Sequence, residues 1–144
     1  MYQRPNFQAY KQADMATADK GKILIMLYDH CIKWCRVAID SAKKNEFQAR
    51  TKAIFKVQDA ITELICALDY EKGGDIATNL YKLYEFYNWH LSQANITNSA
   101  EKIQDVCTML EDLRSAWVVA ADQVRRQNSM NMTNHQASYV SVMG

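Results

Sequence analysis

Histidine and cysteine side chains are the first candidates for chemistry in this sequence. A di-iron site in a helical bundle needs Glu-x-x-His pairs that face inward. None of the three histidines, His30, His90 and His135, lies three residues after a glutamate. The one local cluster is His30, Cys31 and Cys35, whose spacing places side chains on one helix face. A metal site would require further ligands to converge on that cluster.

Cys66 and Cys107 are the remaining thiols, and both fall outside the apolar stripes of the helices on which we expect them. The four thiols are therefore not expected to converge, and they lack the CxxC spacing of zinc or redox motifs. Gly73-Gly74 follows no strand, so it is not a phosphate loop. We expect no enzyme, no catalytic residue, no cofactor and no metal site. A metal-binding or redox bundle enzyme is the alternative from another class.

Large apolar side chains outside the expected core stripes are the second group of candidates. A helix of a bundle needs to bury only one stripe, and aromatic residues dominate the hot spots of protein interfaces. We therefore assign the surplus residues to the binding of a partner protein. The alternative is that isolated exposed apolar residues are normal and that some cover loops. The surplus residues are Ile25, Phe55, Tyr81, Phe86, Trp89 and Val118.

Residues 1–15 lack helical periodicity but carry aromatic side chains on a polar background, at Tyr2, Phe7 and Tyr10. These side chains could anchor an N-terminal arm in an apolar groove, or they could simply complete one end of the domain. Both interpretations remain open at this point.

The elements that must position these residues are four amphipathic helices. Apolar residues recur at spacings of three and four over about Asp19–Lys44, Glu46–Leu68, Ile76–Ala94 and Ser99–Arg126. Gly73-Gly74 is the clearest stop signal, with Asp75 as the cap of the third helix. Because all connections are short, we expect an all-α, antiparallel up-down four-helix bundle. The expected divisions are an arm over 1–15, the bundle over 16–127 and a flexible, disordered tail over 128–144.

The expected stripes assign Trp117 to the core, where its loss would be costly. The stripes of the four helices also include Leu24, Leu68, Ile76, Leu80, Ala120 and Val124.

Composition and charge narrow the possible functions further. The chain has 144 residues with 17 basic and 16 acidic side chains mixed along it, for a net charge of +1. Because it has no basic block, we expect no nucleic-acid binding. No apolar run approaches the roughly 18 residues of a membrane span, and the N-terminus lacks the apolar stretch of a signal peptide. We therefore expect a cytoplasmic protein with free thiols and no membrane insertion.

Several ordered strings resemble the FliS family of flagellar secretion chaperones. They cover about residues 9 to 120 and include Ala9-Tyr10, Leu24-Ile25-Met26-Leu27-Tyr28-Asp29, Gly73-Gly74-Asp75-Ile76-Ala77, Leu83-Tyr84 and Leu113-Arg114-Ser115-Ala116-Trp117. The chain departs from the family at Asp19-Lys20, where Ser-Pro is frequent. It is also more aromatic over Phe86 to His90, and the tail matches no family pattern.

The resemblance implies a helical-bundle chaperone that binds the disordered C-terminal segment of flagellin. It would prevent premature polymerisation and deliver its cargo to the export gate of the flagellar type III apparatus, without nucleotide or metal. A chaperone for another flagellar export substrate is the alternative. Weak self-association of the free protein is left open.

The resemblance also implies that the N-terminal arm covers part of the binding surface until cargo displaces it. We expect Tyr10 to anchor the arm and to lie at the binding surface, with Tyr2 and Phe7 assisting. The leading cargo contacts would be Ile25, Tyr28, Phe55 and Tyr81, followed by Phe86, Trp89 and Val118.

Overall fold

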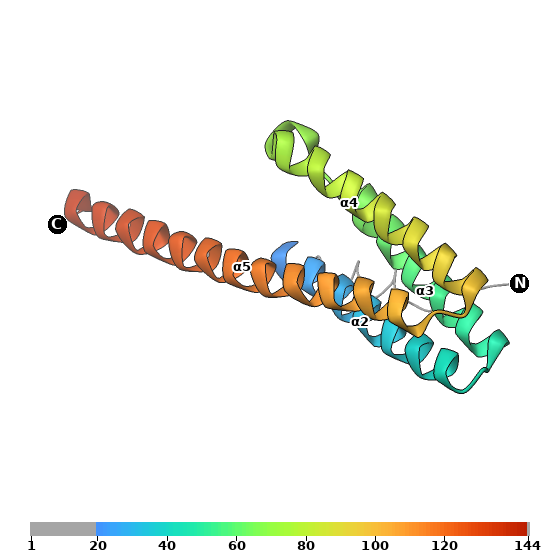
Figure 1. Ribbon diagram of the computed structural model, residues 1–144. Coiled ribbons are helices and arrows are strands. Elements are labelled where there is room, and N and C mark those ends of the chain that lie inside the picture. The colour runs from blue at the N-terminus through green and yellow to red at the C-terminus, as the bar shows by residue number, and fades with distance from the viewer. Residues whose placement is uncertain (1–19, 144) are drawn as a thin grey trace, which may run out of the picture.

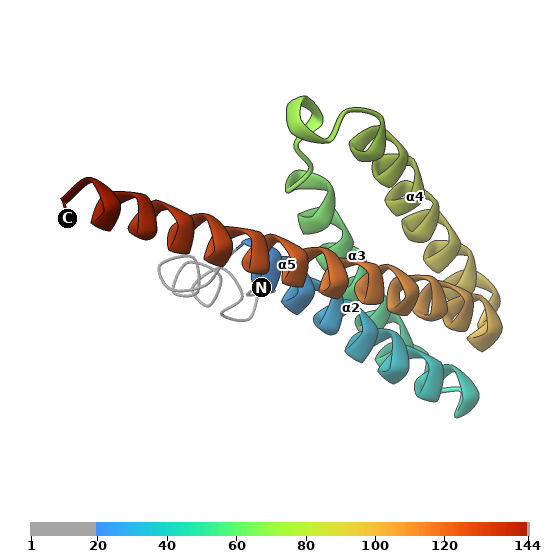
Figure 2. The same ribbon diagram turned by 90° about the vertical axis from the view of Figure 1, so that its left-hand side faces the viewer.

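The computed structural model describes residues 20–143, and the side chains of residues 20–134 (Figures 1 and 2). The described chain forms four helices, α2 (Lys20–Lys43), α3 (Phe47–Cys66), α4 (Tyr70–Thr97) and α5 (Ala100–Met143). No strand occurs within residues 20–143. The expected all-α fold is confirmed.

The helices pack around a ring in which each contacts two neighbours. Helix α2 lies against α3 and α5, and α4 completes the ring by packing against the same two helices. Ion pairs between α2 and α5 join Arg36 to Glu111 and Asp29 to Arg114, so the two helices run in opposite directions. Thr51 and Gln58 of α3 likewise contact α4 in reversed order. The predicted antiparallel bundle is therefore present.

The core consists of side chains at helical spacing on the inner face of each helix. Tyr28, Ile54, Leu91 and Leu110, one from each helix, are fully buried. Each large apolar side chain removed from water in this way contributes about 1.5–3 kcal/mol. The stripes of three- and four-residue spacing therefore account for the assembly of the bundle.

A network of polar side chains fastens one end of the bundle, which we call the closed end. The buried Arg50 of α3 donates from Nε to Asn95 Oδ1 at 2.9 Å, and its guanidinium also donates to Asn98 Oδ1. Asn98 Nδ2 in turn donates to Asn45 Oδ1 at 2.9 Å. Asn45 and Asn98 occupy the left-handed region with φ of 56° and 51°, which asparagine tolerates better than most residues. The network joins the α2–α3 connection to the α4–α5 connection.

The opposite end contains the connection from α3 to α4, and here the sequence-based boundaries need correction. The cap of α4 is Asp69, whose Oδ1 accepts from the backbone N–H groups of Glu71 and Lys72 at 3.1 and 3.0 Å. The helix therefore begins at Tyr70, before the glycine pair that we expected to precede it. A cap that satisfies two free N–H groups can start a helical turn even just ahead of a glycine.

Gly74 then kinks α4, with a φ of 49° and a ψ of −124°, a conformation that is open essentially to glycine alone. Gly73 also allows a close approach, since a Cβ there would lie 2.9 Å from the Cβ of Ala77. Figures 1 and 2 both show the Gly74 end of α4 standing away from α5. The bundle is therefore open at this end, which we call the furrow end.

Helix α5 extends well past its neighbours and continues to Met143 (Figure 1). The sequence pattern fades near Arg126, and we expected a flexible, disordered tail over 128–144. No glycine or proline interrupts residues 100–143, so the backbone hydrogen-bond ladder has no chemical reason to stop. The side chains of residues 128–134 are all exposed, so these residues add nothing to the core. The N-terminal arm lies outside the described residues.

Candidate protein-binding furrow

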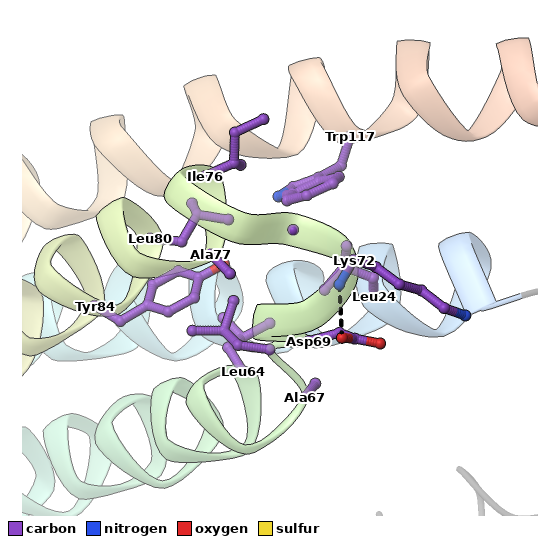
Figure 3. A pocket seen from close by; sticks show the side chains of 12 residues that line it. Leu24, Leu64, Ala67, Asp69, Lys72, Ile76, Ala77, Leu80, Tyr84 and Trp117 are labelled. Carbon is purple, nitrogen blue, oxygen red and sulfur yellow. Dashed lines mark hydrogen bonds between the residues drawn. The ribbon is translucent and has the colours of Figure 1, made fainter.

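An apolar furrow opens between all four helices at the furrow end. Its first part has a volume of about 280 Å³ and lies between the start of α4 and the α2–α5 pair (Figure 3). It is lined by Leu24, Leu64, Ala67, Leu68, Asp69, Lys72, Gly73, Ile76, Ala77, Leu80, Tyr84 and Trp117.

The second part, of about 340 Å³, continues along α2 and α5. Leu24 and Trp117 line both parts, so the two cavities lie side by side, and we call them together the furrow. The second part is lined by Lys20, Gly21, Leu24, Trp117, Ala120, Ala121 and Val124. Among the described residues, the charged side chains in the lining are Lys20, Asp69 and Lys72. The furrow therefore suits an apolar guest with polar flanks.

Residues predicted for the core form much of this furrow. Ile76 and Val124 belong to the stripes of their helices, yet they are 67% and 57% exposed. Leu24 and Leu80 are only half-buried. Their exposure follows from the geometry, because α4 diverges from α5 and α5 outruns its neighbours. The core assignment is therefore wrong for Ile76 and Val124, and the sequence analysis did not find the furrow as a site.

Trp117 also differs from its expected place in the core. Its indole is half-buried and forms a wall between the two parts of the furrow. Its Nε1–H donates a hydrogen bond to Tyr28 Oη at 3.0 Å. Trp117 is thus both a packing residue and a lining residue.

Two buried tyrosines lie beneath Trp117. Tyr28 is 0% and Tyr84 1% exposed, and their hydroxyl oxygens are 2.5 Å apart. Burial raises the pKa of both phenols, so both keep their protons at neutral pH. Tyr28, which we expected to contact a partner, is buried in the core of this structure, and its role in binding stays a prediction. Tyr84, in contrast, lines the furrow.

Ile25 and Val118 lie at a different place, along the outer seam between α2 and α5. Ile25 is one turn before Asp29, and Val118 is one turn after Arg114, which pairs with Asp29. Because the two helices are antiparallel, Ile25 and Val118 come to the same level of the seam. Ile25 is half-buried and Val118 is 38% exposed, but neither lines the furrow.

Tyr81, Phe86 and Trp89 are exposed on the outer surface of α4. The Phe86 ring stacks on His90 with a centroid distance of 5.2 Å, and Trp89 lies 6.2 Å from Phe86. His90 Nε2 lies 3.2 Å from the carboxylate of Asp105, which links this aromatic group to α5.

Phe55 of α3 is 56% exposed, and it lies between Thr51 and Gln58, which both bond to α4. The predicted exposure of these aromatic residues is confirmed. They lie on α3 and α4, away from the α2–α5 seam of Ile25 and Val118, and the structure does not gather the predicted residues into one groove. Tyr2, Phe7 and Tyr10 lie outside the described residues.

Three of the four cysteines are buried, and Cys66 is exposed. Cys107 lies in the core beside Cys35, contrary to its predicted place off the stripe, and its Sγ contacts Glu111 Oε1 at 3.3 Å. The hydrogen bond between Cys35 and Cys107, together with burial, raises the pKa of Cys35. Burial raises the pKa of Cys31 to about 12. No group of three or more potential ligands in the described part of the chain could hold a metal ion.

Comparison with known proteins identifies the family. The model of the family described as "Flagellar protein FliS" matches residues 2–124, most of the chain. The chain belongs to the FliS family. The resemblance noted in the sequence is thereby confirmed.

Curated FliS proteins from several bacteria are similar over most of their length. The flagellar secretion chaperone FliS of Salmonella typhimurium is 31% identical over 90% of this chain and 99% of its own. That of Campylobacter jejuni is 31% identical over 77% of this chain and 87% of its own, and that of Bacillus subtilis 28% over 83% and 89%. Because FliS proteins are named as chaperones, the prediction of a non-enzymatic protein is confirmed.

A crystal structure of a bacterial flagellar chaperone shares the fold. It superposes with a TM-score of 0.69 at 21% identity and covers 83% of this chain and 99% of its own. Among the described residues, no helix combines the length and the apolar content that crossing a membrane requires.

Proposed function

We propose that this FliS protein binds the disordered C-terminal segment of flagellin in the cytoplasm. By holding that segment it prevents premature polymerisation, and it delivers the subunit to the export gate of the flagellar type III apparatus. The names of its relatives, which are flagellar secretion chaperones, support this proposal. The observation that carries it is the apolar furrow, in which side chains of core character stand open to solvent.

The binding mechanism follows from the shape and chemistry of the furrow. An unfolded amphipathic segment can become helical by placing its apolar face in a groove of a preformed protein. Ordering the segment costs about 2–5 kcal/mol or more, which the buried apolar surface must exceed. Ile76 and Val124, at opposite parts of the furrow, offer large exposed surfaces for this purpose. A guest helix that spans both would complete the two stripes that the bundle leaves unpaired.

The exposed residues outside the furrow form a second tier of contacts in this proposal. A segment that leaves the furrow and wraps around the bundle would meet the aromatic group of α4 or the α2–α5 seam. The residues in this tier are Ile25, Phe55, Tyr81, Phe86, Trp89 and Val118.

A charge placed in the furrow tests the proposal. The variants Ile76→Asp and Val124→Asp alter residues that are already largely exposed, so the bundle should still fold. Isothermal titration with a flagellin C-terminal peptide should show binding at least about 10-fold weaker, because each change buries a charge in an apolar contact. Ile96→Asp is the matched control, since Ile96 is 78% exposed on the same helix as Ile76 and outside the furrow. Equal affinities for all three variants would exclude the furrow as the binding site.

The choice of flagellin as cargo has its own experiment. Full-length flagellin should bind, and flagellin without its C-terminal segment should not. If both bind equally, the C-terminal segment is not the ligand. If neither binds while another flagellar export substrate does, the alternative chaperone assignment replaces this one.

The N-terminal arm enters the proposal as a lid, with Tyr10 as its anchor and Tyr2 and Phe7 assisting. Helix α2 begins at Lys20, and Lys20 lines the furrow. The segment that precedes Lys20 is therefore attached to the bundle at the rim of the furrow. Removal of residues 1–15 should strengthen flagellin binding and promote self-association of the empty chaperone, because apolar surface is uncovered. Unchanged affinity and solubility would eliminate the lid.

A further inference from the structure

Three hydrogen-bond donors meet beneath the furrow, and together they hold more hydrogens than the structure uses. The donors are the indole of Trp117 and the hydroxyls of Tyr28 and Tyr84. Trp117 Nε1–H donates to Tyr28 Oη at 3.0 Å, and the two hydroxyl oxygens lie 2.5 Å apart. Among the described residues, the two hydroxyls form no other hydrogen bonds than these two.

Counting hydrogens leaves one without an acceptor. Each of the three groups carries one hydrogen, and an indole can only donate. Two bonds consume two hydrogens, so the third remains on one of the tyrosines whichever of them donates to the other. If Tyr28 donates to Tyr84, the spare hydrogen belongs to Tyr84. If Tyr84 donates, Tyr28 keeps it, and both lone pairs of the Tyr28 oxygen are already occupied.

The position of the two rings decides where the spare hydrogen can be used. Both side chains are buried, but Tyr84 also lines the furrow (Figure 3), whereas Tyr28 does not. Leu80 and Ala77, which lie one and two turns before Tyr84 on α4, are apolar neighbours that offer no side-chain acceptor. A buried donor without an acceptor is unfavourable, and a guest that supplies one removes that penalty. Both phenols stay protonated, since burial raises the pKa of each.

We propose that the floor of the furrow is a polar subsite, in which the Tyr84 hydroxyl donates to a side-chain oxygen of the guest segment. The inference rests on the proposed function, and it adds the chemical class of the group that the subsite accepts. The oxygen would come from Asn, Gln, Ser or Thr placed among apolar residues. A backbone carbonyl is not available in a helical guest, because the helix uses it internally.

The subsite gives the furrow a means to set the register of its guest. Apolar contacts are not directional, so an amphipathic helix could shift by one turn at little cost. A single buried polar partner removes that freedom, as a lone polar residue does in the core of a coiled coil. The guest residue that meets Tyr84 would therefore define which part of the segment is bound.

A double-mutant cycle tests this directly. The flagellin C-terminal peptide and a series in which each Asn, Gln, Ser and Thr is replaced by Ala are titrated into wild type and into Tyr84→Phe. Tyr84→Phe should bind the parent peptide about 3- to 10-fold more weakly, the usual effect of one hydrogen bond. One peptide substitution should weaken binding to wild type by a similar factor and have no effect on Tyr84→Phe.

Tyr87→Phe is the matched control, because Tyr87 is equally buried on the same helix but does not line the furrow. Its affinity for the parent peptide should equal that of wild type. The peptide series in wild type also covers the case in which Tyr84→Phe does not fold, since one substitution should still stand out. Binding of the parent peptide with no polar position that couples to Tyr84 overturns the subsite alone. Failure of wild type to bind the parent peptide overturns the proposed function, and the subsite with it.

Discussion

Replacing Trp117 separates the two roles that the structure gives to its indole. A fully buried tryptophan replaced by alanine costs about 3–5 kcal/mol. Trp117 is half-buried, so Trp117→Ala should destabilise the bundle by less, about 2–3 kcal/mol. Trp117→Phe keeps most of the apolar area but removes the donor to Tyr28, for an expected loss of about 1 kcal/mol.

Urea unfolding followed by circular dichroism measures both losses, and a parallel titration with flagellin peptide measures binding. Trp117→Ala joins the two parts of the furrow into a wider space, so we expect weaker binding from a protein that is still folded. Trp117→Phe should bind nearly as well as wild type, because the wall remains. An unfolding free energy for Trp117→Ala equal to that of wild type would refute the packing role. Unchanged binding by the same variant would refute its role as a wall.

Three further outcomes follow from other parts of the structure. Asn98→Ala should lower the free energy of unfolding by about 2–4 kcal/mol, since it removes closed-end hydrogen bonds and strains a left-handed backbone. Asn98→Gly should cost about 1 kcal/mol less in the same urea assay, because glycine accepts that φ. Burial, and then the charges of Lys33 and Lys56, lower the pKa of His30 from 6.5, so the folded state binds its proton less readily than the unfolded state. Stability should therefore be intact above pH 6.5 and fall as the pH drops below it, and urea midpoints of His30→Gln should fall less. In the native protein one thiol, that of Cys66, should react rapidly with a thiol reagent, and Cys66→Ser should leave no rapid reaction. Rapid reaction of all four thiols in the native protein would contradict the burial of the other three.

The helices and their antiparallel packing were predictable because each stripe repeats over several turns. Helical periodicity also identified exposed aromatic residues correctly, since Phe55 and Trp89 lie off the stripes of α3 and α4. Their role in binding stays a prediction. Errors arose where residues lie at the edge of a stripe. Tyr28 and Cys107 are both buried, because a small change in helix orientation decides which flank of a stripe faces inward.

The furrow could not be found from periodicity alone. An apolar residue at helical spacing looks the same in the sequence whether or not a neighbouring helix covers it. Ile76 is open because the Gly74 end of α4 stands away from α5, and Val124 is open because α5 outruns the bundle. Both causes are properties of the assembled helices. The one local sign was the glycine pair Gly73-Gly74, which is also typical of a helix stop.

The two ends of the bundle are held by different kinds of force, and this difference affects how the protein can respond to cargo. Arg50 and Asn98 hold the closed end through bonds that tolerate little change of angle. The furrow end is held by apolar contacts. Because these contacts are not directional, the helices can shift there at little cost in free energy. The closed end is therefore rigid, whereas the separation of the helices at the furrow end is adjustable. A change of angle between the helix pairs would let the furrow accommodate guest segments of different width, while the hydrogen bonds of the closed end stay intact.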